Sequence, residues 1–149
     1  MGLIEELRTG PVALDAAIFI YFIEEHPRYL PSLVPVFEAI DGGSLAAVTS
    51  AVTLLEVLVV PYRARDQPLA DRYETLLRRS RGLTLVELSQ PQLRLAAQLR
   101  AEVGLRTPDA LQVAAALSAR CSALLTNDRR IPERFGEMRV LQLGAFVGK

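Results

Sequence analysis

The sequence has few of the side chains on which many catalytic sites depend. It contains one histidine, one cysteine and no tryptophan, and Lys149 is the only lysine among its 17 basic residues. His26 and Cys121 lie far apart in the chain, which argues against a histidine-based triad, a zinc site and an internal disulfide. The absence of an internal lysine excludes the phosphate-binding lysine of a Walker A loop.

Long hydrophobic runs and an excess of charge of one sign are also absent. No run of about 18 apolar residues could cross a bilayer, and acidic residues precede any apolar stretch at the N-terminus. With a single cysteine, this composition predicts a cytoplasmic protein with no membrane association. Because the formal net charge is zero, a nucleic-acid site would depend on local clusters of arginine, whose planar fork binds phosphate.

Short apolar strands alternate with helices along the whole chain. Its 149 residues, half of them hydrophobic, fit a single domain over 1–149, with residues 1–10 as a short helix or arm and 144–149 as a tail. The alternation predicts an α/β fold with a mainly parallel central sheet of four to five strands and helices on both faces. Strands are expected at 12–14, 44–48, 83–88, 122–125 and 139–143, and helices at 16–23, 35–40, 50–60, 66–79, 91–103 and 107–117, with a proline-rich loop at 26–35.

The best-specified helix starts at Thr107-Pro108-Asp109. Thr107 is expected to be the N-cap, Pro108 suits the first helical position, and Asp109 falls in the first turn. The following residues are almost all apolar, so the helix should be buried with one carboxylate at its mouth. Asp109 is either a site residue or only a partner for the helix dipole.

Three further acids occupy comparable places. Asp15 follows the first strand, where it is either a helix N-cap or a site residue. Glu56 shares its helix face mainly with valines, which indicates a cleft or a pair with an arginine. Asp128 follows the fourth strand in Thr126-Asn127-Asp128, which is also typical of an Asx turn.

These four acids are expected to meet at one edge of the sheet. In parallel sheets, ligands bind beyond the carboxyl ends of the strands, and each acid belongs to a segment that reaches this edge. Clustered carboxylates repel one another unless a cation lies between them, and an all-oxygen site suits Mg²⁺ or Mn²⁺. Since no side-chain nucleophile is evident, the pattern favours metal-assisted hydrolysis of a phosphodiester.

The segments VALDAAIFIYF, TSAVTLLEVLVVP, LRTPDALQVAAAL and LLTNDRRIPERF, in this order, resemble the PIN-domain (PilT N-terminus) nucleases, most closely the VapC-type toxins of bacterial toxin–antitoxin pairs. The resemblance covers nearly all of residues 12–143. It implies that an acidic quartet binds Mg²⁺ or Mn²⁺ for RNA cleavage and that Thr126 is the hydroxyl residue beside the last acids. The quartet consists of Asp15, Glu56, Asp109 and Asp128.

The resemblance also implies partners: an RNA substrate, a cognate VapB-type antitoxin that covers the acidic groove, and a second copy of the chain in a homodimer. Arginines next to the acids in sequence are the candidates for contacts with RNA phosphates, or else they are surface or ion-pairing residues. These candidates are Arg106, Arg129 and Arg130.

The chain departs from the family pattern after the first acid. Members usually carry Ser or Thr there, whereas this chain has Ala16 and Ala17, which cannot donate hydrogen bonds that orient an acid or a water. The leading interpretation is a Mg²⁺-dependent endoribonuclease toxin. The alternatives are a catalytically weak module that binds RNA or an antitoxin, and a phosphatase or DNA nuclease with the same acids.

Overall fold

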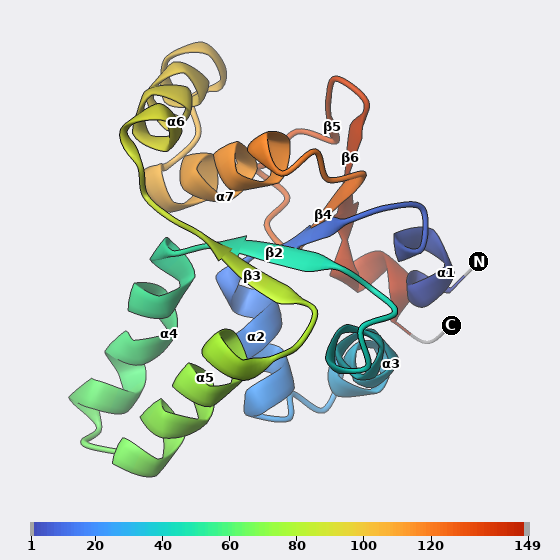
Figure 1. The fold of residues 1–149 in the computed structure, drawn as a ribbon, viewed down its shortest axis with the longest axis vertical. Coiled ribbons are helices and arrows are strands. Elements are labelled where there is room, and N and C mark those ends of the chain that lie inside the picture. Colours follow the sequence, from blue (N-terminus) through green and yellow to red (C-terminus); the bar gives the residue numbers. More distant parts are fainter. Residues whose placement is uncertain (1, 148–149) are drawn as a thin grey trace.

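The computed structural model describes residues 2–147 and contains one six-stranded sheet in the order β3-β2-β1-β4-β6-β5 (Figure 1). Five strands are parallel, and β5 pairs antiparallel with β6. The predicted α/β class and mainly parallel sheet are therefore confirmed, with one strand more than expected. The strands are β1 (Val12–Leu14), β2 (Ala47–Ser50), β3 (Leu83–Val86), β4 (Ala123–Thr126), β5 (Arg134–Phe135) and β6 (Met138–Gln142).

Helices cover both faces of the sheet, as Figure 1 shows. The alternation of side chains along β1 explains how: Val12 and Leu14 pack in the core under one set of helices, and Ala13 packs in the core on the opposite face. The first face carries α1 (Leu3–Leu7), α2 (Ala16–Ile23), α3 (Leu30–Asp41), α4 (Val52–Arg63) and α5 (Gln67–Arg79), and the second carries α6 (Gln90–Val103) and α7 (Thr107–Ser118).

Two helices pass through prolines that the sequence analysis placed at their ends. Helix α3 begins at Leu30, so much of the predicted loop at 26–35 is helical, and Pro35 lies inside it. Helix α4 likewise continues past Pro61 to Arg63. A proline inside a helix removes one backbone hydrogen bond, and here burial of neighbouring side chains such as Leu33 and Leu58 offsets that loss.

Three boundaries near the site differ from the prediction. Strand β2 starts at Ala47 rather than at residue 44, and it ends at Ser50 rather than at residue 48, so that α4 begins at Val52 rather than at residue 50. The N-cap of α7 is Arg106 rather than Thr107, which is already helical. The helix predicted at 91–103 is found as α6, with Ser89 as its N-cap and Gly104, which has φ +80°, as its C-cap.

The ends of the described chain belong to the fold. Residues 3–7 form the expected short helix, with Leu3 and Leu7 buried and Glu6 paired with Arg139 at 2.7 Å. The predicted tail begins instead with a 3₁₀ helix, η1 (Leu143–Phe146), and residues 148 and 149 lie outside the described part. No helix within residues 2–147 has both the length and the apolar composition that crossing a bilayer requires.

Candidate active site

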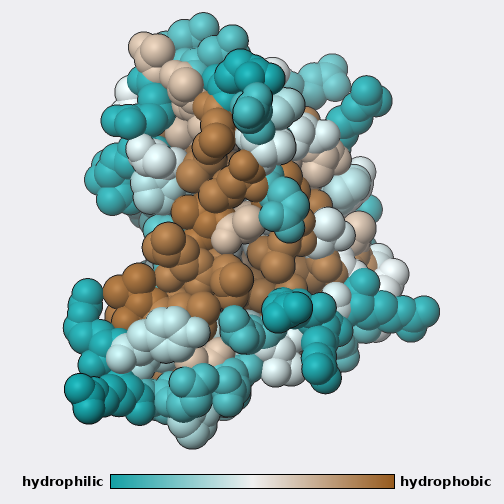
Figure 2. Space-filling model, turned by 60° about the vertical axis from the view of Figure 1, so that its left-hand side comes forward, coloured by the Kyte–Doolittle hydropathy of each residue, from teal (hydrophilic) through white to brown (hydrophobic). Residues whose placement is uncertain are grey.

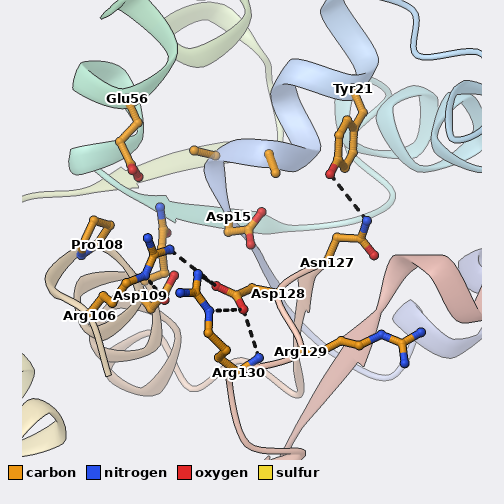
Figure 3. A pocket seen from close by; sticks show the side chains of 13 residues that line it. Asp15, Tyr21, Glu56, Arg106, Pro108, Asp109, Asn127, Asp128, Arg129 and Arg130 are labelled. Carbon is orange, nitrogen blue, oxygen red and sulfur yellow. Dashed lines mark hydrogen bonds and ion pairs between the residues drawn. The ribbon is translucent and has the colours of Figure 1, made fainter. Parts of the chain in front are cut away.

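A pocket of about 390 Å³ lies where the order of strands switches direction, beside the carboxyl ends of β1 and β4. Asp15 comes directly after β1, and residues 127–130 come directly after β4. All four predicted acids line this pocket, together with the three predicted arginines (Figure 3). The pocket-lining acids are Asp15, Glu56, Asp109 and Asp128, and the arginines are Arg106, Arg129 and Arg130.

Asp15 is hydrogen-bonded to the end of the neighbouring strand, β4. Its Oδ2 accepts a hydrogen bond from the hydroxyl of Thr126, the last residue of β4, whereas its buried Oδ1 has no partner within residues 2–147. Burial is the main reason that the pKa of Asp15 is raised to about 7; the charges of Asp109 and Glu56 contribute in the same direction, and the Thr126 hydroxyl acts in the opposite one. Asp15 occupies the N-cap position of α2, but its side chain makes no capping bond.

Thr126 lies beneath the pocket and connects two of the acids. Besides donating to Asp15, its Oγ1 accepts a hydrogen bond of 3.1 Å from the backbone N–H of Asp128. One buried hydroxyl thereby fixes the first and last acids relative to each other.

Asp128 is held by a bidentate ion pair. Arg130 donates from Nε to Oδ1 at 3.0 Å and from Nη2 to Oδ2 at 2.9 Å, and its backbone N–H donates to Oδ1 at 2.9 Å. The last bond is the expected Asx-type turn, so Asp128 has both a local structural role and a place in the pocket. Hydrogen bonds from Arg130 are the main reason that the pKa of Asp128 falls to about 2.

Arg106 bridges Asp109 and Asp128. Its Nε lies 3.3 Å from Asp109 Oδ2, and its Nη2 lies 3.5 Å from Asp128 Oδ2. Burial and the neighbouring Asp128 charge raise the pKa of Asp109, while Arg106 lowers it. Two of the three predicted phosphate-binding arginines are thus paired with the acids in this structure, and Arg129 has no ion pair within residues 2–147.

Glu56 reaches the pocket from α4 (Figure 3). The expected alternative, a pair with an arginine, is not found among the described residues. Burial raises the pKa of Glu56, and the charge of Asp109 contributes in the same direction. Glu56 therefore adds negative charge to a pocket that already holds three carboxylates.

Helix α7 is positioned against the sheet by a buried polar network, which was not predicted from the sequence. Gln112 Nε2 donates to Thr53 Oγ1 at 2.7 Å, Thr53 and Thr49 share a hydrogen bond of 2.6 Å, and Thr49 donates to the carbonyl of Leu14 at 2.6 Å. This network ends one residue before Asp15 and begins one helical turn after Asp109. The signal in the sequence was a lone polar residue, Gln112, inside an apolar helix.

The composition of the pocket suits a hard divalent cation. Among residues 2–147, no three acidic, histidine or cysteine side chains converge closely enough to hold a metal ion, and Arg106 and Arg130 lie against Asp109 and Asp128. The acids nevertheless offer only carboxylate oxygens, which Mg²⁺ and Mn²⁺ prefer. The unpartnered Asp15 Oδ1 is a buried acceptor that such a cation would satisfy.

Comparisons with known proteins identify the family and the fold of the chain. The family model described as PIN domain matches residues 12–136. No curated protein sequence matches the chain. Several solved structures share the fold over most of both chains at low sequence identity.

A toxin–antitoxin complex from Klebsiella pneumoniae is 20% identical, with a TM-score of 0.67, and the match covers 89% of this chain and 97% of that one. VapC20 of Mycobacterium tuberculosis, a toxin that cleaves the sarcin–ricin loop, is 13% identical, with a TM-score of 0.66 and coverage of 86% and 98%. VapBC2 of Rickettsia felis, bound to a promoter DNA fragment, is 17% identical, with a TM-score of 0.64 and coverage of 89% and 98%. The family match spans most of the sequence and includes all four acids of the pocket, so the chain belongs to the PIN domain family.

Proposed function

We propose that this chain is a Mg²⁺-dependent endoribonuclease that hydrolyses RNA phosphodiesters and acts as the toxin of a type II toxin–antitoxin pair. The observation that carries the proposal is the convergence of four carboxylates on one pocket at the switch in strand order. Asp15, Glu56, Asp109 and Asp128 would hold the ion. When bound, the ion supplies a Lewis acid that polarises the phosphodiester and a means of activating water.

The remaining residues of the site have distinct roles in this proposal. Thr126 orients the carboxylate of Asp15, and the network of Gln112 fixes the helix that carries Asp109. Arg106 and Arg130 would leave the acids when the cation arrives and present their guanidinium groups to RNA phosphates. Arg129, which lines the pocket without an ion pair within residues 2–147, is a third phosphate ligand in this proposal.

Cleavage of RNA, single-stranded DNA and a phosphate monoester, measured side by side, tests the proposal. We expect cleavage of RNA with Mg²⁺ or Mn²⁺, none with a chelator, and none by Asp109→Asn. Asp41→Asn, which changes an exposed acid at the end of α3 and outside the pocket, is the matched control and should keep full activity. RNA binding without cleavage would support the catalytically weak module instead, and hydrolysis of DNA or the monoester alone would reassign the substrate.

The proposed biological context is an antitoxin-controlled toxin that acts on RNA in the cytoplasm. The similar structures from Klebsiella pneumoniae and Rickettsia felis are a toxin–antitoxin complex and a VapBC2 assembly, which supports a VapB-type partner for this chain. Expression should therefore arrest growth, and co-expression of an antitoxin encoded beside the gene should relieve the arrest. Growth arrest that persists in Asp109→Asn would contradict a nuclease toxin.

An exposed apolar face supports the proposed homodimer. Leu55 and Val60 on α4 are 64% and 57% exposed, and Val59, Leu88 and Leu93 are also exposed. Figure 2, which turns the side of α4 and α6 forward, shows a continuous hydrophobic area across this face. Monomeric proteins rarely leave a large contiguous apolar area in water, so we assign this face to a second copy of the chain.

A further inference from the structure

Three partly exposed aromatic side chains, Tyr21, His26 and Tyr29, form a cluster beside the pocket. The ring centroids of Tyr21 and Tyr29 are 4.6 Å apart, those of His26 and Tyr29 are also 4.6 Å apart, and those of Tyr21 and His26 are 5.2 Å apart. The guanidinium of Arg28 lies 5.6 Å from the centroid of the Tyr29 ring. This aromatic cluster therefore combines flat apolar surfaces with one positive charge.

Helix α2 connects the aromatic cluster to the acids. It begins directly after Asp15, and Tyr21 lies six residues later, about 9 Å along the helix axis. Ala17 and Tyr21 both line the pocket and are one turn apart on the same helix face. The small side chain of Ala17 thus leaves open the path between the Asp15 carboxylate and the Tyr21 ring.

Asn127 fixes the cluster relative to the acids (Figure 3). It lies between Thr126 and Asp128 in the chain, and its Nδ2 donates to the hydroxyl of Tyr29 at 3.0 Å and to that of Tyr21 at 3.4 Å. Its Oδ1 accepts from the backbone N–H of Gly144 at 3.1 Å, which sets the orientation of the amide. Both phenol oxygens act as acceptors here, and neither phenol proton has an acceptor within residues 2–147.

Tyr21 and Tyr29 pack against the edge of the hydrophobic core, but packing alone does not explain their position beside the pocket. Tyr73, which is fully buried, donates its hydroxyl to Glu24 and belongs to the hydrophobic core. Tyr21, by contrast, lines the pocket, and the phenol protons of Tyr21 and Tyr29 remain available to a ligand. Partly exposed aromatic rings next to positive charge are features with which proteins bind unpaired nucleobases.

We propose that the aromatic cluster is a stacking subsite for an unpaired RNA base adjacent to the scissile phosphate. The proposal rests on the proposed nuclease function and adds a reason for a preference for single-stranded RNA, since a base inside a duplex cannot reach the rings. Stacking tolerates any base, so the subsite contributes affinity and positioning, while Arg28 can contact the neighbouring phosphate.

Binding of a random-sequence single-stranded RNA pool to the full chain tests the subsite. The assay uses the Asp109→Asn background, where the proposed function predicts binding without cleavage. Because the chain has four tyrosines and no tryptophan, RNA stacked on Tyr21 should also quench the tyrosine fluorescence. Tyr21→Leu should weaken binding about 5- to 150-fold and reduce the quenching, whereas Tyr21→Phe, which keeps the ring, should bind within about twofold of the parent.

An abasic RNA of the same length separates stacking from phosphate contacts. The Asp109→Asn protein, which is the parent here, should bind abasic RNA about as weakly as the Tyr21→Leu variant binds normal RNA. The affinity of the Tyr21→Leu variant should be the same for abasic and for normal RNA. If the wild-type chain cleaves RNA but Tyr21→Leu binds it as tightly as the parent, the subsite is refuted and the nuclease function stands. If the wild-type chain neither binds nor cleaves RNA, both proposals fail together.

Discussion

Replacing Asp15 with asparagine should stabilise the cation-free protein at high pH. Burial raises the pKa of Asp15 to about 7 from an ordinary value of 3.8. A folded-state pKa above the unfolded-state value means that the folded protein binds the proton more tightly, so this group lowers the free energy of unfolding as pH rises from about 4 to about 7. At about 1.4 kcal/mol for each pH unit, the full loss is about 4 kcal/mol.

The comparison between two pH values isolates this effect. At about pH 5 only about 1.6 kcal/mol of the loss has developed, whereas at about pH 8.5 all of it has. The advantage of Asp15→Asn over the wild type should therefore grow by about 3 kcal/mol between these conditions. Contributions that do not depend on pH, such as the unpaired amide of the asparagine, cancel in this difference.

Urea denaturation followed by circular dichroism, with a chelator present, measures the two free energies. Asp128→Asn is the control of opposite sign, because Arg130 holds the pKa of Asp128 at about 2 and the charged form stabilises the fold above that pH. Asp128→Asn should consequently lose about the same stability at both pH values, because both lie above the pKa of Asp128 in the folded and the unfolded state. An Asp15→Asn advantage that is the same at both pH values would refute the burial argument.

Three further predictions concern the surroundings of the acids and the apolar face. Thr126→Val should lower the free energy of unfolding by about 2–4 kcal/mol in urea denaturation, because it leaves the Asp15 carboxylate and a backbone N–H unpaired. The control Thr84→Val, at an exposed position, should change it by less than about 0.5 kcal/mol, and equal effects of the two variants would contradict the role of the Thr126 hydroxyl. Arg130→Ala should raise the pKa of Asp128 toward its ordinary value in an NMR titration, and it should tighten Mn²⁺ binding measured by calorimetry. If neither value changes, the ion pair does not control the charge of Asp128 or its access to the cation. Val60→Asp should weaken self-association about tenfold or more in light scattering, since it places a charge in the apolar face, and an unchanged dimer would assign that face to another partner.

The sequence predicted those features that depend on local order along the chain. Hydrophobic strands followed by acids indicated a parallel sheet with its carboxylates at one edge, because in such a sheet all strands present the same end. The helices predicted at 66–79 and 91–103 are found within one residue of these bounds, because their ends depend on neighbouring groups such as the capping side chains of Asp66 and Ser89.

Features that depend on distant residues could not be predicted in the same way. The ion pair of Arg106 with Asp128 and the bonds from Asn127 to the two tyrosines join segments separated by 22 and about 100 positions. The β5–β6 hairpin was missed because a two-residue strand is too short to show alternation. The predicted helix boundaries at Pro35 and Pro61 were wrong because tertiary packing outweighed the local tendency of proline to end a helix.

A calorimetric titration of Mg²⁺ into the wild-type chain and three variants tests most directly whether the acids form one cation site. Saturable binding is expected for the wild type and for the Asp41→Asn control, and it should be lost in Asp15→Asn and in Asp109→Asn. Binding that survives in both pocket variants, or that is absent from the wild type, would contradict a cation site built from these carboxylates.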